Sequence, residues 1–128
     1  ELANLVSKAA PAPKHRRHPA TKTFQAIRIF INRELDELNA ALEATIDVLA
    51  PGGRLAVISF HSLEDRAVKR FIRDASREPM QYRGLPDIPR KFRPPLKTIG
   101  KAIAPLDDEV AANPRARSSR LRIAERIS

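Results

Sequence analysis

Five polar side chains follow directly on an apolar stretch in the middle of the chain. The apolar stretch reads LAVISF, from Leu55 to Phe60. Within the next six positions come His61, Ser62, Glu64, Asp65 and Arg66. Histidine and carboxylate groups hold or move protons, and an arginine binds phosphate. The spacing therefore indicates either a substrate site or the polar cap of a helix.

The sequence on both sides of these polar residues is typical of an α/β protein. The turn-forming run APGG, residues 50–53, is followed by the nearly continuous apolar run RLAVISF, residues 54–60. Such a run predicts a parallel strand that is covered on both faces. Ser62 and Asp65 have the spacing of a helix cap. The helix that they begin is expected from about Leu63 to Ser76, so a strand leads directly into a helix.

The polar residues lie where an α/β protein binds its ligand. Ligands of open sheets bind beyond the carboxyl ends of the strands, which makes His61 and Ser62 the candidate catalytic residues. Each has a structural alternative, because Ser62 suits a helix N-cap and His61 suits a backbone contact at a strand end. Glu64 and Asp65 also complement a helix dipole. Arg66 either pairs with one of these carboxylates or binds a phosphate.

Two helical patterns and a basic run precede this strand. Residues 1–10 place apolar side chains on one face of a short helix. From Pro19 to Leu49 apolar residues recur every three or four positions, which predicts one long helix or two helices joined near Asn32. Between these patterns the run PAPKHRRHP, residues 11–19, is typical of a basic linker or hinge.

A basic loop and two strands are expected in the C-terminal part. Residues 77–95 contain five prolines, and this loop is either disordered or contacts RNA through Tyr82, Arg83, Arg90, Lys91, Phe92 and Arg93. The runs LKTIGKAI and SSRLRIAERI predict an antiparallel pair, joined around an acidic turn at residues 107–109. In the second run, Leu121 and Ile123 are expected to face inward, with Arg120 and Arg122 in solvent. The resulting sheet is incomplete and has an exposed edge.

The charge of the chain favours a polyanionic partner. The 128 residues include 24 Lys and Arg against 15 Asp and Glu, for a net charge of +9. A basic surface attracts nucleic-acid phosphates. There is no cysteine, which excludes disulfides and thiolate zinc sites. No apolar run is long enough to cross a bilayer, and the cytoplasm is the expected compartment.

Three longer segments resemble one known family. They are HPATKTFQAIRIFINREL, LAPGGRLAVISFHSLEDRAVKRF and NPRARSSRLRIAER, in this order along the chain. In that order they resemble segments of the ribosomal RNA small subunit methyltransferase H family. The resemblance implies S-adenosylmethionine-dependent methyl transfer to the N4 amine of a cytosine at the decoding site of 16S rRNA.

The resemblance also implies a fold and a division into domains. The fold is the C-terminal part of a class I, Rossmann-like α/β methyltransferase, with a parallel strand, flanking helices and a terminal antiparallel hairpin. Residues 1–17 correspond to the end of an inserted helical domain and a basic linker. Residues 18–128 correspond to the C-terminal half of the methyltransferase domain. The RNA-binding candidates are His18, Thr21, Lys22, Arg66, Arg83, Arg90, Lys91 and Arg93; the structural alternative for His18 is a contact at the start of the following helix.

The sequence lacks the segments that bind the cofactor in this family. The glycine-rich cofactor loop, the acidic residue after the second strand and the fourth-strand motif are absent. We therefore expect a fragment that neither binds S-adenosylmethionine nor is active alone, and no metal site. The expected partners are 16S rRNA in the small ribosomal subunit and the missing N-terminal half, or a second copy paired through the exposed edge. The alternative function is a non-catalytic, basic RNA-binding module.

Overall fold

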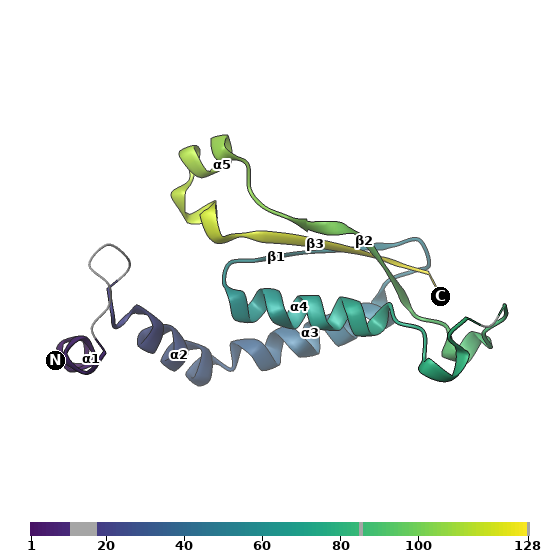
Figure 1. Ribbon diagram of the computed structural model, residues 1–128, viewed down its shortest axis with the longest axis horizontal. Coiled ribbons are helices and arrows are strands. Elements are labelled where there is room, and N and C mark those ends of the chain that lie inside the picture. Colours follow the sequence, from purple (N-terminus) through teal and green to yellow (C-terminus); the bar gives the residue numbers. More distant parts are fainter. Residues whose placement is uncertain (11–17, 85, 128) are drawn as a thin grey trace. The chain divides into compact units, whose positions relative to one another are not determined.

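The computed structural model describes residues 1–10, 18–84 and 86–127 (Figure 1). The chain divides into two compact units, Glu1–Asp36 and Glu37–Ser128, and each is described here by itself. The basic run that was interpreted as a linker lies mostly outside the described residues. The domain boundary expected between residues 17 and 18 borders the same segment and stays a prediction.

The first unit is helical. It contains α1 (Leu2–Ala9) and α2 (Thr21–Asn32), and the first residues of α3 (Glu34–Val48). Of the two possibilities left open by the sequence, two helices are present. They are separated by Arg33, whose left-handed backbone, with φ 51° and ψ 34°, interrupts the helical hydrogen bonds. In the sequence, the spacing of three and four between apolar residues runs through this position, which is why it indicated one helix as well as two.

A glycine turn leads into the first strand. Gly52 has φ +83°, a conformation that residues with a side chain rarely adopt, and its N–H donates to the carbonyl of Arg126 at 2.7 Å. A Cβ on Gly53 would lie 2.8 Å from the Ala50 carbonyl oxygen, so this position is also restricted. The turn thereby joins the start of β1 (Arg54–Ser59) to the end of the last strand.

The sheet has three strands in the order β1-β3-β2. The terminal hairpin is confirmed, since β2 (Leu96–Ile103) pairs antiparallel with β3 (Arg120–Arg126). The strand expected to be parallel pairs directly only with β3, and antiparallel to it, within the part of the chain that the structure describes. A parallel partner requires a crossover from another strand. Since β3 opposes both neighbours, β1 and β2 run in the same direction on either side of it.

Helix α4 (Ser62–Ala75) covers one face of this sheet, with α3 next to it (Figure 1). The core between helices and sheet consists of the buried side chains Leu42, Val68, Ile72, Leu96 and Ala124. Burial along β1 alternates, so the expectation that both faces of this strand are covered was wrong for the described residues. One layer of helices buries every second strand residue and leaves the others exposed.

The two faces of β3 are the reverse of the expected ones. Arg122 faces α4, where it pairs with Asp65, and Ala124 is fully buried on the same face. Leu121 and Ile123 therefore lie on the opposite face, together with Ile58, which is 59% exposed. The expectation failed because the ion pair to α4, which alternation alone does not reveal, holds an arginine on the covered face. The segment expected as an acidic turn is the short helix α5 (Asp107–Ala112), followed by η3 (Pro114–Ser118).

Candidate functional site

The candidate site is the junction between β1 and α4, at the carboxyl end of the strand. Ser59, the last residue of β1, is buried, and its hydroxyl lies 3.4 Å from the carbonyl oxygen of Arg120. The strand ends there, and His61 takes an extended conformation with φ −141°. Because Ser59 is fixed to β3, the direction in which the chain leaves the sheet is fixed as well.

His61, and not Ser62, is the N-cap of α4. The His61 Nδ1 accepts a hydrogen bond from the Glu64 N–H at 3.4 Å. In return, Glu64 Oε2 accepts from the N–H groups of Phe60, at 2.9 Å, and His61, at 3.3 Å. The reciprocal pair is a capping box shifted by one residue from the one that Ser62 and Asp65 predicted. A histidine can take this position because an unprotonated ring nitrogen accepts a hydrogen bond as a hydroxyl oxygen does.

The cap fixes the tautomer of the neutral His61 ring. Since Nδ1 accepts, the proton is on Nε2. Nε2 is buried and lies 3.2 Å from Glu64 Oε1, but the geometry between them is not that of a hydrogen bond, and no other partner is present among the described residues. Glu64 is therefore the polar group beside both ring nitrogens of His61, and Nε2 is closed to solvent.

Asp65 pairs with Arg122 across the helix–sheet interface. Its two carboxylate oxygens accept from the Arg122 guanidinium at 2.7 and 3.0 Å. These hydrogen bonds hold the pKa of Asp65 below its ordinary value of 3.8, and burial opposes the shift only in part. Asp65 lies in the first turn of α4, as expected, but its main partner is this arginine. It therefore serves the packing of α4 on β3.

The remaining polar side chains of the junction face solvent. Ser62 is the first residue of α4 and is exposed. Arg66 is exposed one turn later and makes no ion pair within the described part of the chain. Pairing of Arg66 with Glu64 or Asp65 is not observed, so its guanidinium remains available to a phosphate.

The basic loop has a local structure of its own. It contains two short 3-10 turns, η1 (Met80–Tyr82) and η2 (Arg90–Phe92), whose rings stack with centroids 4.9 Å apart. The Lys91 ammonium lies 4.8 Å from the Phe92 ring centroid. Arg93 donates to the Ile88 carbonyl oxygen at 2.8 Å and to Asp87 at 3.1 Å. Since Tyr82 and Phe92 stack on each other, each has at most one ring face left for a base.

The other candidates lie in the first unit or in the same loop. The Nδ1 of His18 accepts from the Ala20 N–H at 3.2 Å, which confirms the structural contact at a helix start. Thr21 and Lys22 are exposed in the first turn of α2. These three residues form a local group that is separate in sequence from the junction. In the loop, the side chains of Arg83, Arg90 and Lys91 are exposed.

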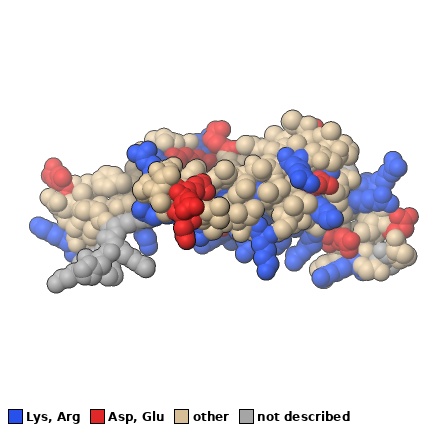
Figure 2. Space-filling model, turned by 90° about the horizontal axis from the view of Figure 1, so that it is seen from above, with Lys and Arg blue, Asp and Glu red and all other residues tan. Residues whose placement is uncertain are grey.

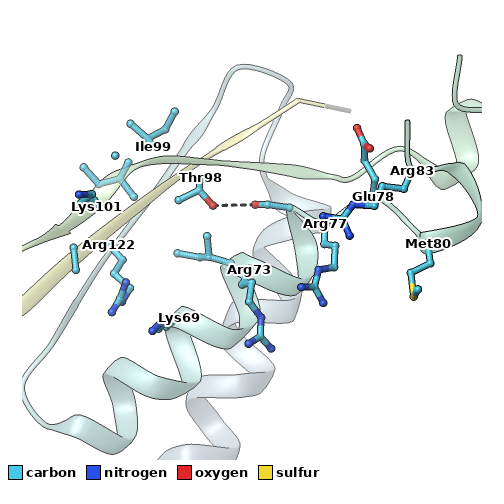
Figure 3. A pocket seen from close by; sticks show the side chains of 15 residues that line it. Lys69, Arg73, Arg77, Glu78, Met80, Arg83, Thr98, Ile99, Lys101 and Arg122 are labelled. Carbon is cyan, nitrogen blue, oxygen red and sulfur yellow. Dashed lines mark hydrogen bonds between the residues drawn. The ribbon is translucent and has the colours of Figure 1, made fainter. Parts of the chain in front are cut away.

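A basic groove of about 780 Å³ lies between α4 and β2 (Figure 3). The sequence interpretation included only Arg83 among its cations and missed Lys69, Arg73, Arg77 and Lys101. Lys69 and Arg73 are four residues apart, which places them on one side of α4, and Arg77 follows at the same interval just beyond the end of the helix. That signal was present in the sequence, but Lys101 joins them only through the tertiary structure.

Neither a metal-binding cluster nor a membrane-spanning helix is found in the part of the chain that the structure describes. The described residues contain no group of three or more histidine or acidic side chains arranged to hold a metal ion. No described helix combines the length and apolar character that a membrane span needs.

Together these features define a mixed α/β protein with its polar junction at a strand end and a basic surface. The chain belongs to the MraW methylase family, whose sequence pattern matches residues 1–127. It is 56% identical over 128 residues to a protein of Coxiella burnetii (strain Dugway 5J108-111) named ribosomal RNA small subunit methyltransferase H. It is 54% identical over 132 aligned residues to a protein of that name from Hamiltonella defensa subsp. Acyrthosiphon pisum (strain 5AT). These alignments cover all of this chain but only 41% and 42% of the two relatives.

Proposed function

We propose that the chain is the C-terminal part of an enzyme that methylates the N4 amine of a decoding-site cytosine in 16S rRNA. The observation that carries this proposal is the identity of more than half of all residues to proteins named ribosomal RNA small subunit methyltransferase H. The alignments span the whole chain and therefore include the segment of the β1–α4 junction. Because the small ribosomal subunit is a cytoplasmic particle, we also propose the cytoplasm as the location.

The sheet supports a larger, Rossmann-like domain. β1 is an edge strand that has only β3 beside it among the described residues, and its free side can accept a parallel neighbour. The face opposite α4 carries apolar side chains, with Ile58 and Ile103 59% and 53% exposed. Both features suit a strand and covering helices supplied by the remaining part of the polypeptide. We propose this N-terminal part as the principal protein partner.

The described residues do not fit the methyl donor. S-adenosylmethionine carries a positive sulfonium, whereas the groove between α4 and β2 is lined by six Lys and Arg side chains and a single carboxylate, Glu78. Like charges repel in such a site. We therefore assign the donor to the remaining part of the polypeptide and the RNA contacts to this chain.

The geometry of the junction supports contact with the target base. His61 Nε2–H is a buried donor without a hydrogen-bond partner among the described residues, so a base carbonyl or a phosphate oxygen would satisfy it once RNA binding exposes the ring. The Ser62 hydroxyl is the adjacent exposed polar group. Since Nδ1 already accepts from Glu64, His61 orients the substrate and does not take up the amine proton. Arg66, one turn further along α4, would bind a neighbouring phosphate.

The second candidate function is a non-catalytic RNA-binding module. It is favoured by the net charge of +9 and by the basic groove, both of which are independent of the junction. The two functions share an RNA partner and differ in whether a methyl group is transferred.

Labelled methyl transfer to small ribosomal subunits distinguishes them. We would incubate subunits with the full-length gene product or with this chain alone, and map the modified nucleotide by mass spectrometry. Label on a decoding-site cytosine with the full-length protein, and none with the chain alone, is the expected result. Absence of label with both proteins would contradict the enzyme and leave the binding module. Label on another nucleotide would contradict the proposed substrate position.

A further inference from the structure

We propose that the groove between α4 and β2 binds the sugar–phosphate backbone of the RNA, at a surface distinct from the β1–α4 junction. The inference rests on the proposed function in one respect, the presence of an RNA partner. The groove is formed mainly by the second half of α4, by β2 and by residues 76–83, and it meets the junction only through Arg122 of β3, which pairs with Asp65.

Both walls of the groove carry cations. Figure 3 shows Lys69 and Arg73 on the helical wall, with Lys101 on the opposite, strand wall. Arg77 and Arg83 extend the row where α4 ends and the basic loop begins. Lys69 and Arg73 are separated by about 6 Å along the axis of α4, at about 1.5 Å a residue, and Arg77 lies just beyond the end of the helix. The cations are thus distributed along a line, as suits a polymer of regularly spaced phosphates and not one small anion.

Most of these charges are not neutralised by the protein. Arg73 is paired with Asp74 at 2.8 Å, and Arg122 is held by Asp65. The other four cations, Lys69, Arg77, Arg83 and Lys101, have no ion pair within the described residues. The carboxylates around them are Glu78 in the groove, Asp74, which interacts with Arg77 through space, and Asp65, which does so with Lys69. The positive potential is therefore concentrated in a hollow, where field lines are focused.

The backbone of β2 adds to the same surface. β2 is an edge strand, and its register with β3 shifts between Ile99 and Ile103. Gly100 in this irregular stretch has φ +64° and an open space where a side chain would be. A bulge redirects the neighbouring side chain and leaves backbone N–H groups without a ladder partner. The open space at Gly100 therefore lets a phosphate approach the strand closely beside Lys101.

RNA fits the groove better than a membrane does. A bilayer presents a flat layer of head groups, whereas these cations line a hollow. Figure 2 shows Lys and Arg side chains also along the margin of the displayed face, with acidic side chains interspersed. The net positive charge is thus general, and what distinguishes the groove is that four cations without an ion pair among the described residues, Lys69, Arg77, Arg83 and Lys101, surround one hollow.

The test uses the full-length protein with Lys69, Arg77 and Lys101 all changed to alanine. The matched control changes Lys97, Arg115 and Arg117, which are exposed cations outside the groove. Affinity for a fluorescent 16S rRNA fragment is measured by anisotropy at several salt concentrations, and folding is checked by circular dichroism. We expect the groove variant to bind about tenfold or more weakly and to lose about 2 from the slope of log affinity against log salt, at about 0.7 a phosphate.

Each other outcome overturns the proposal. Equal affinity and slope for the groove variant and the wild type would show that the groove does not hold RNA. Equal losses in both triple variants would show attraction by net charge alone. Undiminished RNA binding together with lost binding to anionic lipid vesicles would assign the groove to a membrane. Methyl transfer by the wild type is measured in parallel, so that failure of the groove proposal and failure of the proposed function are separate results.

Discussion

Asp65 on α4 and Arg122 on β3 form a two-fold hydrogen-bonded ion pair, with distances of 2.7 and 3.0 Å, across the layer between helix and sheet. Their side chains are 25% and 20% exposed, so the pair is partly shielded from water. The pair holds the helix that begins at His61 against the last strand. The polar junction is thus fixed at two points, by its cap and by this ion pair.

Replacement of Asp65 by asparagine is expected to destabilise the chain by about 1–3 kcal/mol at pH 7, because Arg122 loses a charged partner in a partly buried position. Urea unfolding measures the free energy. Since the pKa of Asp65 is lowered in the folded state, its contribution is present above the ordinary pKa and is lost as the pH falls through the folded one. The difference between wild type and variant should therefore shrink in acid. Asp74→Asn, in an exposed pair, is the control and should change little; a constant difference between pH 7 and pH 3 would contradict the assignment.

Two substitutions of His61 separate its cap from its proposed contact with the substrate. His61→Ala removes both the acceptor for Glu64 and the Nε2 donor, and should cost about 1 kcal/mol of stability as well as turnover. His61→Asn keeps a good N-cap acceptor and loses the ring N–H. We expect near wild-type thermal unfolding for the asparagine variant but reduced kcat of the full-length enzyme for both. Wild-type turnover of His61→Asn would exclude the substrate role.

Arg33 is the residue that divides the helical stripe, and its left-handed backbone is unfavourable for a residue with a side chain. Glycine adopts this conformation without strain, which stabilises the folded state, but it also has more freedom in the unfolded chain, which offsets part of the gain. Arg33→Gly should therefore stabilise the first unit only slightly, by about 0.5 kcal/mol. Arg33→Val should destabilise it, since a β-branched side chain is strained there. Both variants lose the exposed ion pair to Asp36, so this loss cancels in the comparison. Equal thermal unfolding midpoints would contradict the effect of the backbone conformation.

The exposed apolar face and free edge of the sheet predict self-association of the isolated chain. Ile58 and Ile103 lie more than half exposed, and burying them removes apolar surface from water. We expect dimers in sedimentation velocity at micromolar concentration. The double change Ile58→Lys and Ile103→Lys should shift the chain to monomer, whereas Ile31→Lys, on the exposed surface of α2, should not. A monomeric wild-type chain would contradict this expectation.

Local patterns identified most of the elements. The run LKTIGKAI is β2 from its first to its last residue, and the period of the apolar residues predicted α2 and α3 together with the possible break near Asn32. These features depend on neighbours in the sequence, which is why alternation and helical spacing reveal them. The position of His61 and Ser62 at the carboxyl end of a strand followed from the same local order.

Contacts between distant residues determined the rest. The sequence favoured Ser62 as the cap because serine is the usual residue, but the strand ends one position earlier and His61 takes that place. The sequence pattern predicted Arg122 to face solvent, because alternation defines two faces of a strand but does not show which one is covered. The ion pair with Asp65, 57 residues away, determines that Arg122 lies on the covered face. The basic groove likewise required β2 to lie beside α4. The sequence by itself therefore determined the elements and the family, whereas the tertiary structure decided their orientation and partners, because ion pairs and packing between remote segments have no local signature.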